Sequence, residues 1–378
     1  MRLAIISLPL HVNYGGILQS YALKKELESM GHEVSVIDRK VKMPFPKWWK
    51  APFVYMNRSL KNLKGGYGAP EVFREYRYKK EIPVLGSHLK GFIDAEITPV
   101  MIDTYRDIRK GDYDGFIVGS DQVWRPRYFG KVEDAFLDFA RGWDVRRVAY
   151  AASFGTDNLE FESETLRICA DLLAEFDAVS VRESSAVKMC DEWLDCDHAV
   201  HVLDPVMLTD VSDYHRIAGF SKTRRAQGKV MTYILDPADN KKAVTELVKS
   251  WTGKNVEDFS INPHERHRPL EDRIVPPMEE WLAGFADADF VVTDSFHGCV
   301  LCLLFHKPFI AVGNGQRGMS RMNSLLDMFG LGQRLVHGID PEDDGEFFLT
   351  EPDWETIDRI LAEQRMVSRA FLENALKR

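Results

Sequence analysis

The chain has 378 residues, of which 45% are hydrophobic and 28% are charged, the proportions of an ordinary soluble protein. A chain of this length exceeds what one hydrophobic core usually organises, so the length predicts two domains. The net charge of −9 argues against a nucleic-acid binder, and it means that an anionic ligand must meet a local group of basic residues.

Neither the apolar runs nor the cysteines indicate a membrane-spanning or secreted protein. No apolar run is long enough to span a bilayer, and the first residues read as a strand rather than as a signal peptide. The five cysteines are loosely spaced, unlike a disulfide framework. Cys299 and Cys302 form a CxxC pair on an apolar helix, where packing is favoured over a metal or redox role. We therefore expect a cytoplasmic protein.

The first half of the chain alternates predicted strands and helices. Residues 3–8 form an apolar strand, residues 17–30 a helix that ends at Gly31, and residues 33–38 a second strand. Residues 41–100 are less regular and predict an insertion over the domain edge. The alternation then returns with strands at 114–118, 147–152, 178–182 and 200–203. Strands separated by helices predict right-handed crossovers and a parallel sheet.

A polar, basic stretch at residues 221–228 is the predicted linker to a second α/β unit. Its predicted strands are 230–235, 256–261, 289–293 and 308–312, and two helices are expected over 353–378. The fold class is therefore α/β, with two facing Rossmann-like domains and a cleft between their strand carboxyl ends. The expected domains are residues 1–220 on the acceptor side, residues 228–350 on the donor side, and C-terminal helices 353–378 that return to the first domain.

The segment from Phe290 to Gly298 is the strongest functional signal. It reads as a buried strand, a polar turn with Asp294, Ser295 and His297, and the start of an apolar helix. In a parallel sheet this edge binds ligands, and a helix that begins there directs free N–H groups at them. An imidazole beside such an anion site suggests proton transfer on an anionic substrate.

Two loops of the first half carry further candidate residues. The loop with Asn13, Tyr14, Gly15 and Gly16 lets backbone approach a ligand, but it is not a GxGxxG motif, so we do not expect NAD. The run Gly119-Ser120-Asp121-Gln122-Val123-Trp124 suits a sugar, with polar groups for hydroxyls and Trp124 for an apolar sugar face. The alternative, a capped helix with Trp124 in the core, is equally favoured.

Several arginines are candidates for binding carboxylate or phosphate, because the guanidinium group bonds both in a bidentate manner. They are Arg182 at a strand end and the cluster of Arg317, Arg321 and Arg334. His264 and His267 have a spacing that a metal site can use, but their Pro-rich polar loop favours a solvated role.

Six short motifs follow one another along the chain: Asn13–Gly16, Gly119–Trp124, Ala152–Gly155, Ser180–Glu183, Leu203–Pro205 and Thr293–Gly298. In this order they resemble the polysaccharide pyruvyl transferase family. The resemblance reaches from near the start to about residue 330, and neither the insertion at 41–100 nor the tail beyond 340 matches a motif. It implies a GT-B-like fold and transfer of pyruvate from phosphoenolpyruvate to a sugar, which forms a pyruvate ketal in cell-surface glycan or exopolysaccharide biosynthesis.

The chemistry of a ketal sets the roles that we expect. A general acid protonates the methylene carbon of phosphoenolpyruvate, and a base accepts a proton from the sugar hydroxyl. We assign His297 as the acid, and Asp294 or Asp121 as its partner or as the base. The expected substrate-binding residues are Asn13, Tyr14, Gly15, Ser120, Gln122, Trp124, Ser153, Arg182, Ser295, Gly298, Arg317 and Arg321. We expect no requirement for a cofactor or a metal, and phosphoenolpyruvate is expected as a co-substrate.

Two other functions stay open at this point. One is a GT-B glycosyltransferase that uses a nucleotide sugar, and the other is a non-catalytic glycan-binding protein on the same fold. The expected partners are phosphoenolpyruvate and a sugar or lipid-linked glycan, with no nucleic acid. The aromatic run at residues 46–55 is a candidate homo-oligomer interface or a contact with the inner face of the membrane, although a covering loop packed on its own domain is favoured.

Overall fold

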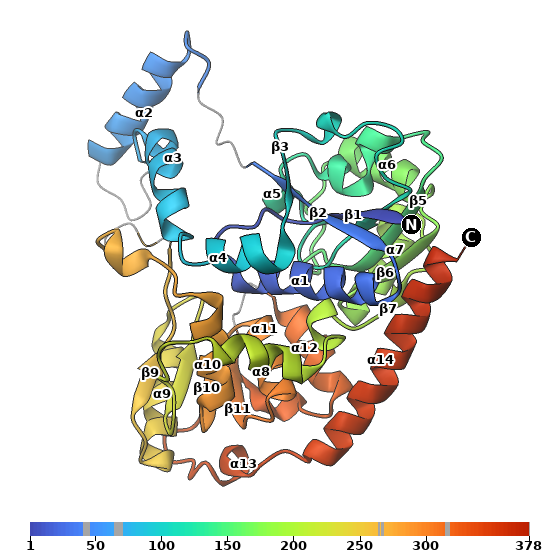
Figure 1. Ribbon diagram of the computed structural model, residues 1–378. Coiled ribbons are helices and arrows are strands. Elements are labelled where there is room, and N and C mark those ends of the chain that lie inside the picture. The colour runs from blue at the N-terminus through green and yellow to red at the C-terminus, as the bar shows by residue number, and fades with distance from the viewer. Residues whose placement is uncertain (41–45, 64–70, 264, 266–267, 314–317, 378) are drawn as a thin grey trace.

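Figure 1 shows the computed structural model of the chain as two stacked α/β units. The structure describes residues 1–40, 46–63, 71–263, 265, 268–313 and 318–377. The first sheet has seven parallel strands in the order β3-β2-β1-β4-β5-β6-β7. These strands are β1 (Arg2–Ile6), β2 (Glu33–Arg39), β3 (Val100–Ile102), β4 (Gly115–Val118), β5 (Arg146–Ala152), β6 (Ala178–Val181) and β7 (Val200–His201).

The second sheet has five parallel strands in the order β12-β11-β10-β8-β9. They are β8 (Val230–Tyr233), β9 (Val256–Asp258), β10 (Phe290–Thr293), β11 (Phe309–Val312) and β12 (Leu335–Val336). The central strands β8, β10 and β11 are buried along their whole length. Such continuous apolar runs are typical of parallel sheets, because helices cover both faces.

The helices connect and cover these strands. They are α1 (Tyr14–Ser29), α2 (Ala51–Leu63), α3 (Arg74–Leu85), α4 (Lys90–Phe92), α5 (Pro126–Phe129), α6 (Ser163–Leu173), α7 (Ser184–Leu194), α8 (Val211–Gly219), α9 (Asp239–Thr252), α10 (Met278–Asp287), α11 (Phe296–Leu304), α12 (Met319–Met328), α13 (Glu346–Leu349) and α14 (Trp354–Leu376). Single turns of 3₁₀- or π-helix occupy Ile93–Ile97, Tyr105–Asp107, Val132–Phe136, Asp138–Ala140, Pro205–Met207, Glu271–Arg273 and Gly332–Arg334.

The strand orders locate the ligand-binding edge of each sheet. In the first sheet the order reverses between β1 and β4, and in the second it reverses between β8 and β10. At such a reversal, the two following helices lie on opposite faces of the sheet and leave a crevice at the strand carboxyl ends. The loops after β1, β4, β8 and β10 are therefore the ones that build a site.

The predicted α/β class with two Rossmann-like, GT-B-like units is confirmed, with three differences in detail. The insertion at 41–100 leads directly into β3, an edge strand of the first sheet that the sequence did not predict. Helix α8 begins just before the polar stretch and packs against α10 of the second unit. The two helices expected over 353–378 are a single helix, α14, because its sequence contains neither Gly nor Pro to interrupt it.

Helix α14 runs along both units (Figure 1). Near its start, Trp354 stacks on His306 of the second unit. Further along, the Ser368 hydroxyl accepts a hydrogen bond from the Leu203 amide at 3.0 Å, and Arg369 pairs with Glu26 of α1. Of the helices in the described ranges, none has the length and apolar character needed to cross a membrane.

Candidate active site

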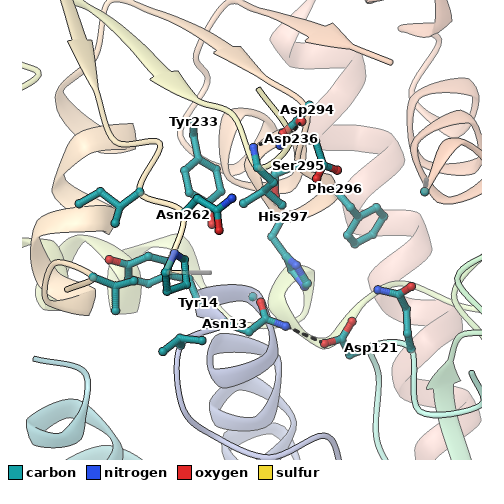
Figure 2. A pocket seen from close by; sticks show the side chains of 18 of the residues that line it. Asn13, Tyr14, Asp121, Tyr233, Asp236, Asn262, Asp294, Ser295, Phe296 and His297 are labelled. Atoms are coloured by element: carbon teal, nitrogen blue, oxygen red, sulfur yellow. Dashed lines mark hydrogen bonds between the residues drawn. The ribbon is translucent and has the colours of Figure 1, made fainter. Parts of the chain in front are cut away.

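A cavity of about 390 Å³ lies between the carboxyl edges of the two sheets. The first unit contributes the loop before α1 and the turn after β4, and the second contributes the loops after β8 and β10 and the start of α12. Figure 2 shows His297 pointing across the cavity from the second unit toward Asn13 and Asp121 of the first. The cavity thus lies where the strand orders of both sheets reverse.

His297 is held by contacts from both units. It is the second residue of α11, whose N-cap residue Ser295 accepts a hydrogen bond from the Gly298 amide. Its Nε2 atom lies 3.6 Å from Oδ2 of Asp204 in the first unit. A Cβ atom at Gly15 would lie 2.0 Å from Nδ1 of His297, so only glycine allows the ring to rest against the start of α1.

Asp204 is the buried carboxylate behind this histidine. Its Oδ2 accepts hydrogen bonds from the Ser120 hydroxyl and from Nη1 of Arg182, each at 2.8 Å. Burial alone raises the pKa of Asp204, but His297 and Arg182 outweigh burial and leave the pKa below its usual range. Asp204 is therefore an anion that orients His297, the role that we had expected of Asp294 or Asp121.

Asp121 is the carboxylate of the first unit that faces the cavity. It has a φ of 74°, a left-handed conformation that Asp tolerates better than most residues. This turn directs the carboxylate toward Asn13, whose side-chain amide donates to Oδ2 at 3.1 Å, as Figure 2 shows. The other oxygen lies 3.5 Å from Nη2 of Arg182. Asp121 can accept a proton or a hydroxyl hydrogen bond from a molecule in the cavity.

Asp294 also lines the cavity, but its oxygens are engaged by the protein. Oδ1 accepts from the Leu235 amide at 2.6 Å, and Oδ2 accepts from the Asp236 amide and from Nζ of the buried Lys241. These contacts fix the loop after β8 against the turn after β10. Asp294 therefore shapes the cavity wall, which leaves Asp121 as the better candidate for a base.

Arg321 supplies a cation to the cavity from α12. Gly318 precedes it with a φ of 71°, and a Cβ there would lie 2.7 Å from Nη2 of Arg321. Burial, followed by repulsion from Arg182, lowers the pKa of Arg321 to about 10. Its Nε is buried without a hydrogen-bond partner. A buried guanidinium with unused donors indicates an anionic ligand. Arg317 lies outside the described residues.

Four residues predicted to bind substrate lie behind the cavity wall. Trp124 is in the core, where it stacks on Phe136 at 5.0 Å, so the core alternative holds and the sugar-platform prediction is wrong. Arg182 is buried between Asp204, Asp121 and the ring of Phe296, so it positions the site rather than binding substrate. Buried Ser120 donates to Asp204, and Ser153 donates to Glu183.

Some of the remaining predicted residues line the cavity, and the others pack against neighbouring elements. Tyr14 lines the cavity and also joins the two units, because its ring stacks on Trp281 at 4.6 Å and its hydroxyl donates to the Pro276 carbonyl. Gln122 lines the cavity and accepts from Arg125. Gly298 packs α11 on β10, since a Cβ there would lie 2.4 Å from Oγ1 of Thr293. Arg334 is buried under backbone carbonyls, away from the cavity.

Sequence reasoning missed four residues of the site. Asp204 had a usable signal, because it follows β7 at the same edge as the other candidate loops. Asp236 follows β8 in the same way and lines the cavity. Tyr233 and Asn262 also line it, and no pattern in the sequence indicates them.

Metal ligands are not gathered anywhere in the described part of the chain, where no three His, Cys, Asp or Glu side chains are placed to hold an ion. The five cysteines are buried as free thiols. Burial raises the pKa of Cys302, which suits the packing role expected of the CxxC pair. His264 and His267 lie outside the described residues.

Two Rossmann-like units that share a cavity at their strand carboxyl ends define the two-domain α/β architecture of the GT-B type. The sequence then identifies the family: the model of polysaccharide pyruvyl transferase matches residues 13–316. The chain belongs to the polysaccharide pyruvyl transferase family, as the motifs predicted, and is thus a member of a transferase family. A comparison with curated proteins found no match.

Three solved structures show the range of overall similarity. UDP-GlcNAc 2-epimerase from Methanocaldococcus jannaschii is 14% identical with a TM-score of 0.48, covering 96% of this chain and 92% of that chain. The epimerase from Neisseria meningitidis bound to UDP-GlcNAc is 12% identical with a TM-score of 0.47, covering 99% and 100%. The E. coli heptosyltransferase WaaC with ADP is 14% identical with a TM-score of 0.39, covering 96% and 100%.

We predict that Asp204→Asn destabilises the protein by about 3 kcal/mol, because Arg182 loses its buried counter-charge. The pH dependence should change as well. The pKa of Asp204 is lowered in the folded state, so its contribution to stability is present above about pH 4 and is lost as the pH falls toward the folded pKa. In urea unfolding between about pH 5 and pH 2, the free energy of unfolding of this variant should fall less steeply with decreasing pH than that of the wild type. Exposed Asp197→Asn is the control, and equal slopes in both would contradict the assignment.

We also predict that Gly15→Ala displaces the His297 ring. The added methyl would overlap Nδ1, and such overpacking costs about 1–3 kcal/mol. The imidazole signals of His297 in a heteronuclear NMR spectrum should move, and the unfolding midpoint should fall. Gly91→Ala, where a Cβ meets nothing within 4 Å, is the matched control. Unchanged His297 signals in Gly15→Ala would show that the ring does not rest on Gly15.

Proposed function

We propose that the protein transfers pyruvate from phosphoenolpyruvate to two hydroxyls of a sugar, which forms a pyruvate ketal and releases phosphate. One observation carries this proposal. A buried, incompletely partnered guanidinium, Arg321, shares the cavity with His297 in a chain of the pyruvyl transferase family.

The donor's charges match the cationic features of the cavity. Phosphoenolpyruvate carries a carboxylate and a phosphate, and Arg321 can bond either of them in a bidentate manner. Helices α1 and α11 both begin at the cavity, with Asn13 and Ser295 as their N-cap residues. Their first N–H groups and the positive ends of their dipoles favour an anion.

His297 is the proposed general acid, and its contact with Asp204 supports Nδ1 as the reacting nitrogen. Nε2 faces the ionised Asp204, so a proton on Nε2 is favoured and Nδ1 is the atom that exchanges a proton with the donor. Protonation of the methylene carbon of phosphoenolpyruvate leaves an oxocarbenium-like centre at the carbon that bears the phosphate. The same nitrogen then recovers a proton as the sugar reacts.

The rest of the reaction balances without a further reagent. The first sugar hydroxyl adds to the oxocarbenium carbon, and Asp121 is placed to accept its proton. The second hydroxyl adds to the same carbon as the bond to phosphate breaks. Of the two hydroxyl protons, one replaces the proton that His297 gave to the new methyl group, and the other leaves with phosphate. No electron transfer is involved, so this scheme needs no redox cofactor.

The polar lining suits a sugar as the acceptor. Asp121, Gln122 and Asn262 offer amide and carboxylate groups for hydroxyls, and Tyr233 offers an aromatic surface. Such a glycan, free or lipid-linked, would belong to cell-surface polysaccharide synthesis. In the assay, the protein is incubated with phosphoenolpyruvate and a panel of sugars and lipid-linked glycans. Phosphate release and the mass gain of the acceptor are then measured. Nucleoside diphosphate release from a nucleotide sugar, without phosphate release, would refute the proposal.

We predict that His297→Gln lowers kcat about 10²–10⁴-fold, the usual contribution of a general acid, because glutamine cannot deliver the proton. Binding of phosphoenolpyruvate, measured by calorimetry, should largely survive. Exposed His337→Gln controls for the loss of an imidazole elsewhere and should retain wild-type turnover. Near-normal turnover by His297→Gln would remove this residue from the mechanism.

We predict that Arg321→Gln weakens phosphoenolpyruvate binding by about 10–100-fold, because the loss of one charge-assisted hydrogen bond costs about 1.5–3 kcal/mol. The effect should appear in KM for phosphoenolpyruvate more than in KM for the sugar. Arg359→Gln, at an exposed position of α14, is the control. An unchanged KM for phosphoenolpyruvate would place the anion elsewhere in the cavity.

A further inference from the structure

Helices α2 and α3 form an arm that projects from the body of the protein, at the upper left of Figure 1. We define the arm as residues 46–63 and 71–85. No residue of α2 is buried, although its sequence is rich in large apolar residues. The expectation that this segment packs on its own domain is therefore wrong for the face of α2 that points outward. An exposed apolar surface of this kind indicates an interaction site.

The apolar residues of α2 form one continuous stripe. Phe53, Met56, Leu60 and Leu63 follow one another at spacings of three and four residues, which places them on one helix face. Phe53 is 69% exposed and Leu63 is 83% exposed. Two further exposed aromatic residues, Trp48 and Trp49, stand in the turn before the helix, and Trp48 is 82% exposed.

Basic residues flank the stripe. Residues 46–63 contain Lys47, Lys50, Arg58 and Lys61 and no acidic residue, in a chain whose net charge is −9. Lys50 and Lys61 are eleven residues apart, so they lie on the same side of the helix, next to the apolar stripe. Within the ranges that the structure describes, no carboxylate pairs with either lysine. The arm is thus a local cationic surface on an anionic protein.

We propose that this arm docks on the surface of an anionic phospholipid bilayer. Trp, Phe and Leu on one face and lysines beside it are the composition of helices that lie in the membrane interface. The aliphatic stems of lysines extend along the apolar stripe, and their ammonium groups reach lipid phosphates. A second copy of the chain is a poorer occupant, because two such stripes would bring like charges together. The negative charge elsewhere on the chain keeps other faces away from the same surface.

Contacts within the arm join its two helices. Within it, Arg58 pairs with the buried Glu75 at 2.7 Å, and Tyr55 packs on Phe73. The hydrogen bonds from Arg58, with its charge, lower the pKa of Glu75 to about 2, so this pair stays ionised under physiological conditions.

The base of the arm contacts the second unit beside the cavity. Arg273 pairs with Glu81 at 3.0 Å, and the Val275 amide donates to the Leu85 carbonyl at 3.0 Å. Val275 itself lines the cavity. The arm therefore connects the membrane-docking surface to the wall of the cavity, which suits a lipid-linked acceptor; this last consequence alone rests on the proposed function.

The test is co-sedimentation of the full chain with vesicles of phosphatidylcholine alone or mixed with phosphatidylglycerol. We expect binding to the mixed vesicles only, and weaker binding as salt rises. The variant Trp48→Ser, Phe53→Ser, Leu60→Ser should lose this binding. Lys50→Glu with Lys61→Glu should weaken it at least 25-fold, at roughly fivefold for each lysine removed near the surface. These side chains are exposed, so all variants should fold, which circular dichroism checks.

Met366→Ser with Val367→Ser is the matched control, because both are exposed apolar residues on the distant helix α14. It should bind to both kinds of vesicle as the wild type does. Equal binding to both kinds of vesicle, or equal loss in the control, would overturn the proposal. So would a wild-type dimer in analytical ultracentrifugation that the triple variant abolishes, since the stripe would then be a self-interface. Vesicle binding is measured without substrate, so it stands or falls separately from the transferase proposal.

Discussion

The placement of one imidazole ring depends on both halves of the chain. His297 is carried by α11 of the second unit, but it rests against Gly15 and beside Asp204 of the first unit. This arrangement of the candidate site therefore exists only while the units are closed on each other. Tyr14 holds this closure by stacking on Trp281, and the Ser184 amide does so by donating to the Ser324 hydroxyl. Helix α14 adds contacts on both sides of the junction.

The strand orders explain why the site forms at this part of the junction. Each sheet has one reversal of strand order, and each reversal opens a crevice at the strand carboxyl ends. The first contributes Asn13 and Asp121, and the second contributes Asp294 and His297. Each crevice alone lacks part of the chemistry, since the buried carboxylate Asp204 and the imidazole that it orients come from different sheets.

Local patterns in the sequence predicted which loops form the site better than they predicted which side chains line it. The buried strand, polar turn and apolar helix at residues 290–298 indicated His297 because all three signals are local. Trp124 was ambiguous because a strand-end aromatic can face either a ligand or the core, and only the packing of Phe136 and Phe154 decides between them. Asp204 and Arg182 form their pair across 22 residues, and such a contact leaves no periodicity in the sequence. Whether the aromatic run at residues 46–55 packs on the protein or faces outward also depends on contacts between distant segments, which leave no local pattern in the sequence.

One cation of the closed site, Arg321, lacks a paired counter-charge among the described residues. Arg182 and Arg321 each have buried nitrogens without a hydrogen-bond partner, but Arg182 forms ion pairs with Asp204 and Asp121. Arg321 forms no ion pair with a carboxylate in the described ranges, and its pKa is lowered by burial and by Arg182. An anion in the cavity removes this imbalance by supplying the missing counter-charge. Because α12 packs on α7 of the first unit, Arg321 has this environment only in the closed arrangement. Under the proposed function, donor binding and closure therefore favour each other, so phosphoenolpyruvate helps to assemble the site that protonates it.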